Sequence, residues 1–100
     1  MIKVKIYQKN KEIDKIIIQG HADFDDYGKD IVCAGVSVLT FTIANKLLEI
    51  SKNDINENNN KFIFNLIDKN KDVELLVETL IFGLKSIEKQ YPQNIKIVEV

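Results

Sequence analysis

The sequence predicts a two-layer α+β domain in which a mainly antiparallel sheet packs against two helices, in the order β-β-α-(β)β-α-β. Three observations support this fold class. The first 19 residues contain alternating apolar and polar side chains, two later segments carry apolar residues at helical spacing, and short β-branched or aromatic segments separate them. A chain of 100 residues has the size of one domain, so residues 1–100 are assigned to a single domain.

The N-terminal segment is predicted to form an antiparallel hairpin. Its first strand places Ile2, Val4 and Ile6 on one buried face, because they alternate with lysine and tyrosine side chains. The segment 13–19 is rich in β-branched isoleucine and forms the second strand. The connection 8–12 is short and polar, which favours direct antiparallel pairing of the two strands.

The segment 31–50 has the period of an α-helix, and Asp30 stands where its N-cap would be. The apolar stripe of this helix consists of Val32, Val36, Leu39, Ile43, Leu47 and Ile50. The next face carries only small residues, namely Cys33, Ser37, Thr40 and Ala44. A face of small side chains allows another element or a substrate to approach closely.

The second half of the chain adds strands and another helix. Its polar beginning allows a weak edge strand around 53–57, followed by a hairpin turn at 58–60 and a strand at 61–67. A last strand is expected at 94–100, after Pro92 has barred continuation of the preceding helix.

That second helix is predicted over residues 71–90, with Asn70 or Asp72 as its cap. Gly83 lies in its middle, where glycine costs about 1 kcal/mol relative to alanine. A close contact with another element would explain this glycine. The apolar stripe of the helix consists of Val73, Val77, Leu80, Leu84 and Ile87.

The composition argues against several classes of protein. Net charge is −1 and all 14 basic residues are lysine, so the arginine fork that reads phosphate and guanine is missing, and no direct nucleic-acid binding is expected. The N-terminus lacks the apolar core of a signal peptide. No apolar run is expected to approach the roughly 20 residues that span a bilayer. A cytoplasmic protein without a membrane partner is the expectation.

Metal binding has little support in the sequence. Asp23, Asp25 and Gly28 match positions of a calcium-binding EF-hand loop, but Ala34 stands where that loop needs a bidentate glutamate. A zinc site would have to use the single histidine and the single cysteine of the chain with an aspartate. A lone cysteine also excludes an internal disulfide. No metal and no cofactor are expected.

His21 and Cys33 are candidates for nucleophilic catalysis. Cysteine attacks as the thiolate, which a nearby imidazole or a helix N-terminus stabilises. With Asp30 as N-cap, Cys33 falls in the first helical turn, and the loop after the second strand is long enough to return His21 to that turn. The alternative is that Cys33 is simply a small buried residue and His21 a hydrogen-bonded loop residue. The spacing alone leaves both interpretations open.

A longer motif contains these two residues. Gly20-His21-Ala22 is followed by Tyr27-Gly28-x-Asp30-Ile31-Val32-Cys33-Ala34-Gly35-Val36-Ser37, and together they resemble the signature of the Prp family, the ribosomal-processing cysteine proteases of bacteria. The likeness extends to element order and length, to Gly83-Leu84-Lys85 and to Tyr91-Pro92.

The resemblance implies a cysteine endopeptidase that removes the N-terminal extension of large-subunit ribosomal protein twenty-seven. That extension ends in apolar and aromatic residues. Cys33 matches the family nucleophile and His21 its general base, and Gly20, Asp30 and Ser37 match further motif positions. The resemblance also implies a homodimer and a mobile loop at about 22–29.

Several roles stay open at this point. Asp30 either caps the helix, which we favour, or orients His21. Ser37 either lines the site or is small for packing. Phe24 and Tyr27 either cover the substrate or anchor the loop, and Gly28 would supply a hinge or a positive φ.

The acidic residues Asp23, Asp25 and Asp26 form a solvated loop in the interpretation that we favour, although they would also attract a basic protein tail. Two other functions compete with the protease. One is a non-catalytic, ribosome-associated binding module on the same scaffold, and the other is a cysteine hydrolase with a different substrate.

Overall fold

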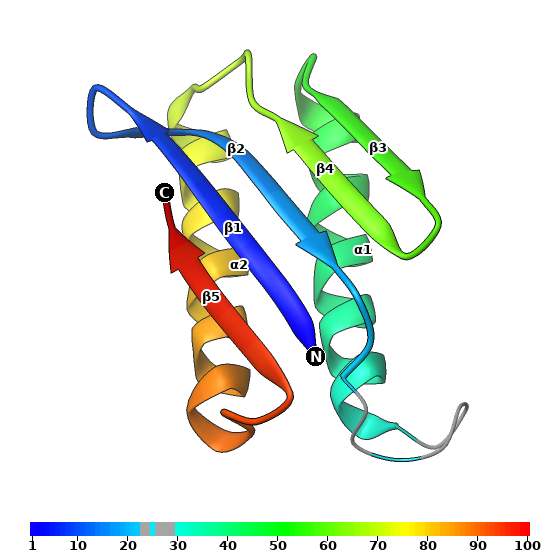
Figure 1. The fold of residues 1–100 in the computed structure, drawn as a ribbon. Helices are drawn as coiled ribbons and strands as arrows, with labels where there is room; N and C mark the ends of the chain where they lie inside the picture. The colour runs from blue at the N-terminus through cyan, green and yellow to red at the C-terminus, as the bar shows by residue number, and fades with distance from the viewer. Residues whose placement is uncertain (23–24, 26–29) are drawn as a thin grey trace.

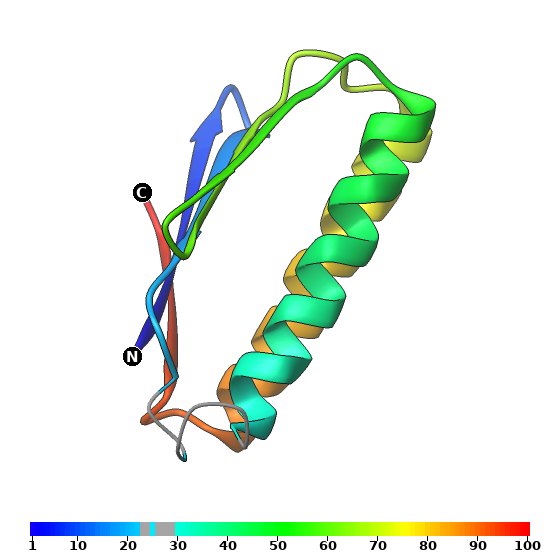
Figure 2. The same cartoon turned by 90° about the vertical axis from the view of Figure 1, so that its right-hand side faces the viewer.

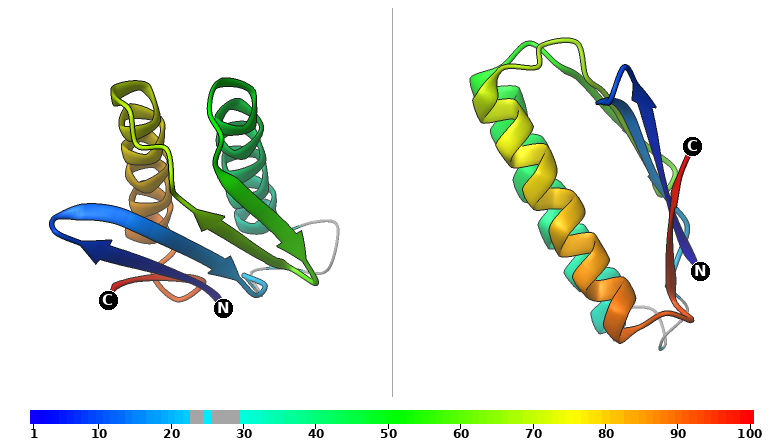
Figure 3. Two further views of the ribbon diagram at one scale, coloured as in Figure 1. Left: turned by 90° about the horizontal axis from the view of Figure 1, so that it is seen from above. Right: turned by 90° about the vertical axis from the view of Figure 1, so that its left-hand side faces the viewer.

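The computed structural model describes residues 1–22, 25 and 30–100 of the chain. Within these residues, a five-stranded sheet forms one layer and two helices form the other (Figure 1). Both helices lie side by side on the same face of the sheet (Figures 2 and 3). The elements in chain order are β1 (Ile2–Lys9), β2 (Glu12–Gln19), α1 (Ile31–Ile50), β3 (Asp54–Asn58), β4 (Lys61–Asn65), α2 (Lys71–Gln90) and β5 (Ile95–Glu99). The predicted fold class is confirmed.

The strands are arranged in the order β3-β4-β2-β1-β5. The pairs β1/β2, β2/β4 and β3/β4 are antiparallel, whereas β5 returns after α2 to lie parallel to β1. The sheet is therefore mixed, with antiparallel pairing predominating as predicted. The end of β2 and the beginning of α1 lie at the same end of the molecule (Figure 1).

The core lies between the sheet and the helices. Its strand residues include Ile2, Val4 and Ile6, which are buried as their alternation predicts. From the helices it takes the predicted stripe residues Val32, Val36, Ile43, Leu47, Val73, Val77, Leu80 and Leu84. The assignment of Ile50 to the stripe is wrong: this side chain is 37% exposed, because it is the last residue of α1.

The fourth strand ends earlier than predicted, at Asn65 rather than at residue 67. The side-chain oxygen of Asn53 accepts hydrogen bonds from the backbone N–H groups of Ile67 (2.7 Å) and Asp68 (2.8 Å). Asn53 itself is buried. Because these N–H groups bond to a side chain, the chain leaves the sheet ladder there and turns toward α2.

Gly83 lies where α2 packs against the Leu39 side chain of α1. A Cβ atom at this position would lie 2.5 Å from Cδ2 of Leu39. Asn70 caps α2, with its side chain accepting from the backbone N–H of Val73 at 3.0 Å. The close helix–helix contact explains why a glycine is placed in the middle of this helix.

The helix α1 is more apolar than the sequence-based expectation allowed. It has 20 residues and a mean hydropathy of 1.8, which by length and composition is enough to cross a membrane. The expectation that no segment approaches this length is therefore wrong. In the structure α1 packs against α2 and the sheet, as core helices of similar composition also do.

Candidate active site

His21 lies directly after the end of β2, and Gly20 provides the backbone conformation that this requires. Gly20 has φ +100°, in the region that favours glycine. A Cβ atom there would also lie 2.6 Å from the carbonyl oxygen of Met1. Both the conformation and the space therefore require glycine immediately before His21.

Replacing Gly20 by alanine is expected to lower the free energy of unfolding by about 1–3 kcal/mol, because the added methyl group is strained and meets backbone. Cleavage activity should fall as well, since His21 is displaced. Urea unfolding and a cleavage assay measure both effects.

Gly35→Ala is the matched control for this variant, because Gly35 lies inside α1. A Cβ at Gly35 would lie 3.8 Å from the side chain of Ile87 in α2, which is an ordinary van der Waals contact. It should be neutral or stabilising. A Gly20→Ala protein with wild-type stability would refute the requirement for glycine.

Cys33 lies in the first turn of α1, and Asp30 caps this turn. One carboxylate oxygen of Asp30 accepts hydrogen bonds from the backbone N–H groups of Val32 and Cys33, both at 3.0 Å. The predicted cap role is confirmed. The Cys33 N–H, a candidate oxyanion donor, is thus already occupied by Asp30 in this structure. The first turn of α1 itself contains no acidic residue, so its dipole favours negative charge on the Cys33 sulfur.

The backbone of Ala22 connects the two sides of the site. Its N–H donates a hydrogen bond to the sulfur of Cys33 at 3.2 Å, and such a donor stabilises a thiolate. The Ala22 carbonyl oxygen accepts a hydrogen bond from the side-chain amide of Asn94 at 2.9 Å. The backbone carbonyl oxygen of Asn94 in turn accepts from the Ile2 N–H at 2.9 Å. Asn94, just before β5, thus fixes the segment that contacts the nucleophile candidate.

The ring of His21 contacts the β3–β4 hairpin. Its Nε2 atom lies 3.1 Å from Nδ2 of Asn60, while the His21 residue itself is exposed. The sequence indicates only a turn at Asn60. Its position opposite the end of β2 follows from the pairing of Gln19 with Lys61, which the sequence does not specify.

His21 and Cys33 line one hollow of about 240 Å³. Gly20 and Ser37 line it too, whereas Asp30 belongs to the cap and not to the lining. The other lining residues are Ile2, Ile18, Gln19, Val36, Thr40, Phe41, Glu57, Asn60 and Phe62. The structure therefore brings four of the predicted site residues into one cavity, and the catalytic roles themselves stay predictions.

Two aromatic rings and a buried threonine form part of this cavity. The rings of Phe41 and Phe62 pack edge to face, with centroids 4.8 Å apart. The Thr40 hydroxyl is buried and finds no hydrogen-bond partner among the described residues. The apolar and aromatic part of this lining suits an apolar or aromatic peptide side chain.

Part of the predicted loop lies outside the described residues: Asp23, Phe24, Asp26, Tyr27 and Gly28. Asp25 is described and is exposed. In the described part of the chain, no group of three or more His, Cys, Asp or Glu residues is arranged to hold a metal ion.

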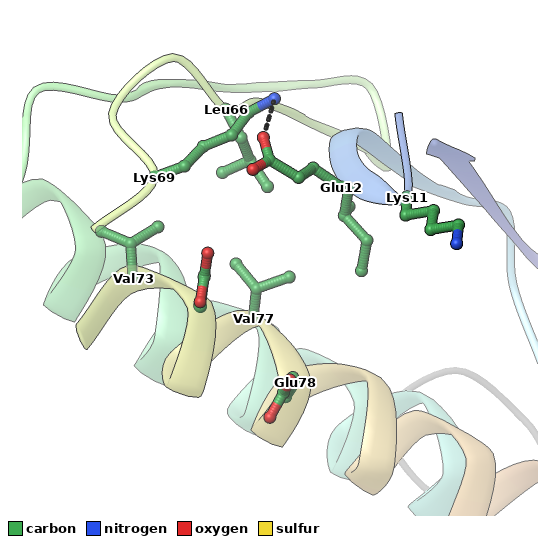
Figure 4. A pocket seen from close by; sticks show the side chains of 9 residues that line it. Lys11, Glu12, Leu66, Lys69, Val73, Val77 and Glu78 are labelled. Carbon is green, nitrogen blue, oxygen red and sulfur yellow. Dashed lines mark ion pairs between the residues drawn. The ribbon is translucent and has the colours of Figure 1, made fainter. Parts of the chain in front are cut away.

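A second hollow, of about 220 Å³, lies at the opposite end of β2 (Figure 4). Leu66, Val73 and Val77 form its apolar wall, and no cysteine, histidine or serine lines it. The Lys69 side chain lines this hollow (Figure 4). Its Nζ atom lies 3.8 Å from a carboxylate oxygen of Glu12 and 2.8 Å from a carboxylate oxygen of Asp14.

The hydrogen bond from Lys69 lowers the pKa of Asp14 below 3.8, and the same bond raises the pKa of Lys69 above 10.5. A carboxyl with a lowered folded-state pKa contributes stability above its unfolded value, and this contribution is lost as pH falls through the folded value.

Asp14→Asn should therefore lower the urea midpoint slightly at pH 7, because the pair is exposed. The difference from wild type should shrink below pH 3.8. Lys69→Met removes the same pair and should show the same trend at acid pH. A difference that grows on acidification would contradict this assignment.

Comparisons with known proteins place the chain among proteins of one family. The family model described as cysteine protease Prp matches residues 1–96. The ribosomal processing cysteine protease Prp of Staphylococcus aureus is 35% identical over 91 residues, which cover 86% of each chain.

Two crystal structures of an essential ribosomal processing protease Prp from S. aureus are also similar. The one with a covalently linked product peptide has a TM-score of 0.94 at 32% identity. The one with a substrate peptide has a TM-score of 0.88 at 31% identity. In both comparisons 100% of each chain is covered.

Proposed function

The chain belongs to the cysteine protease Prp family, and from this premise we propose that it removes the N-terminal extension of large-subunit ribosomal protein twenty-seven. Cys33 is the nucleophile and His21 the general base in this proposal. One observation carries it: His21 and Cys33, the single histidine and single cysteine of the chain, line the same hollow at the capped start of α1.

The reaction follows from the groups in that hollow. His21 takes the proton of the Cys33 thiol, and the sulfur attacks the scissile carbonyl carbon. The tetrahedral adduct collapses when the carbon–nitrogen bond breaks and His21 returns the proton to the leaving amine. Water, deprotonated by His21, then attacks the thioester, which releases the extension as a carboxylic acid and restores the thiol.

Two features of the structure support sulfur as the reacting atom. The helix start and the Ala22 N–H both favour a negative charge at Cys33. Asp30 opposes that charge through its own carboxylate, so a protonated His21 is the balancing group. In this proposal the attacking species is the Cys33 thiolate, paired with the His21 imidazolium.

The lining of the hollow supports the proposed substrate class. Two structures of the S. aureus Prp hold a substrate peptide or a covalently linked product peptide. Val36, Phe41 and Phe62 offer apolar and aromatic surface beside Cys33. An extension that ends in apolar and aromatic residues would place such side chains against this surface, with its scissile bond at the sulfur.

The proposal includes a cytoplasmic homodimer that does not bind nucleic acid directly. Apolar side chains of both helices support a second copy as partner, because Val38, Leu48, Leu75 and Phe82 are 52–76% exposed. Dimerisation would remove this surface from water. Sedimentation equilibrium measures the mass, and a monomer at micromolar concentration would contradict this part.

The cleavage assay uses a peptide that spans the N-terminus of the host's own ribosomal protein twenty-seven precursor. Mass spectrometry should find one cut between the extension and the mature sequence. If the host protein begins directly with its mature sequence, the substrate is wrong even when the thiol is reactive. Cleavage of other peptides only would favour a cysteine hydrolase of different specificity.

The rate of Cys33 alkylation against pH separates the protease from a ribosome-associated binding module. The protease should react well below about pH 8.5, where an ordinary thiol ionises. An inert thiol throughout that range would favour the binding module.

A further inference from the structure

Asn60 occupies the second position of the two-residue turn between β3 and β4. Asn58 pairs with Lys61, and both Asn59 (φ 46°) and Asn60 (φ 62°) have positive φ. This is the backbone pattern of a tight hairpin turn that asparagine and glycine favour. The turn fixes the direction in which the Asn60 side chain leaves the backbone.

The same turn is attached to the end of β2. The pairing of β2 with β4 ends at Gln19 and Lys61. One step further, the Gly20 N–H donates to the Asn60 carbonyl oxygen at 3.2 Å. Asn60 is therefore tied through its backbone to the residue before His21, and through its side chain to the His21 ring, with 3.1 Å between Nδ2 and Nε2.

We propose that Asn60 is a positioning residue that holds the His21 ring so that its other nitrogen, Nδ1, serves Cys33. This inference rests on the proposed function. An imidazole that exchanges a proton with a thiol through Nδ1 needs a fixed partner at Nε2, or it rotates away. In cysteine proteases of unrelated fold, a Cys-His-Asn arrangement performs this task.

An amide suits this position because it can present either end to the ring. When His21 is neutral and Nδ1 is the free base, Nε2 carries a hydrogen and the Asn60 oxygen accepts it. The imidazolium formed after proton transfer keeps that same Nε2–H bond. In the structure the Asn60 Nδ2 group faces Nε2, which corresponds to the opposite tautomer, with the hydrogen on Nδ1. Rotating the side-chain amide by half a turn brings its oxygen to Nε2 instead.

Asp30 is the residue that the sequence offered for this role. Its Oδ1 atom instead accepts from two backbone N–H groups of α1. Among the charged residues in the described part of the site, Glu57 lines the hollow from β3 and Asp30 caps α1. Asn60 is the uncharged residue whose side chain meets the ring.

Three variants test the positioning role. Asn60→Gly removes the side chain and keeps the positive φ, Asn60→Asp puts a carboxylate beside the ring, and Asn59→Gly is the matched control one residue earlier in the same turn. For Asn60→Gly we expect kcat to fall about tenfold or more with KM changed less than about twofold, because part of the general-base contribution is lost. Asn59→Gly should keep wild-type values.

The second readout is the pH dependence of cleavage. A carboxylate at position 60 stabilises the imidazolium, so Asn60→Asp should remain active to higher pH than wild type. If the side chain at position 60 only maintained the hairpin and did not contact the ring, the alkaline limb of the pH profile would not shift. If Asn60→Gly cleaves with wild-type kcat, or Asn60→Asp has the wild-type pH profile, the positioning role is overturned.

NMR decides the contact independently of activity. The chain has one histidine, so its ring signals are unambiguous. In wild type the Asn60 side-chain amide signals should shift as His21 titrates, and amide signals that ignore that titration overturn the proposal. A wild-type protein that cleaves no extension peptide would count against the proposed function instead, while the amide response would still decide the contact.

Discussion

Cys33→Ala is expected to abolish cleavage of the extension peptide, with a loss of at least about a thousandfold, because no other group can form the thioester. The fold should be retained. Cys33 is only partly buried, and truncating it removes a single sulfur atom beside the core. Cleavage under saturating peptide and circular dichroism of the same sample measure the two outcomes.

Ser37→Ala is a matched comparison for that variant, since Ser37 lines the same hollow one helical turn later. It should keep most of the activity if its hydroxyl only lines the site. Cleavage by Cys33→Ala at a rate near wild type would end the assignment of the nucleophile.

His21→Gln is expected to lower kcat about 10²–10⁴-fold, the usual contribution of general acid–base catalysis. Glutamine retains a polar side chain at this exposed position but cannot carry a proton between sulfur and nitrogen. Alkylation of Cys33 near pH 7 should slow as well, because the thiolate loses its imidazolium partner. Urea unfolding should be unchanged.

A control separates the loss of the base from a disturbance of the β2 end. Gln19→Ala alters the residue that lines the hollow at the end of β2 and leaves the imidazole in place. It should alter kcat far less than His21→Gln. Equal activity of His21→Gln and wild type would show that the proton transfers use another group.

The helices were predictable because their signals are local. Asp30 and Asn70 cap them as their side chains suggest, and both helices begin and end at the predicted residues. The early end of β4 was not predictable, since it depends on the Asn53 side chain, which reaches the backbone of residues 67 and 68 only in the folded chain. The parallel position of β5 beside β1 is likewise a property of the whole sheet.

The residues of the candidate site likewise fall into those with a local sequence signal and those without one. Cys33 and His21 lie in one continuous motif, so the sequence could suggest both. Asn60 and Asn94 lie 39 and 72 residues from the groups that they contact. Neither carries a local signal beyond that of a turn residue, and only the pairing of β4 with β2 and of β5 with β1 brings them to the site.

The most direct test of the central claim is the mass of the protein during turnover. Wild-type protein is mixed with extension peptide, quenched in acid at times within the first turnover, and measured intact and after digestion. A thioester between Cys33 and the extension, absent from Cys33→Ala, is the predicted result. Cleavage that proceeds with no adduct at any quench time, or with the adduct on another residue, would contradict Cys33 as the nucleophile.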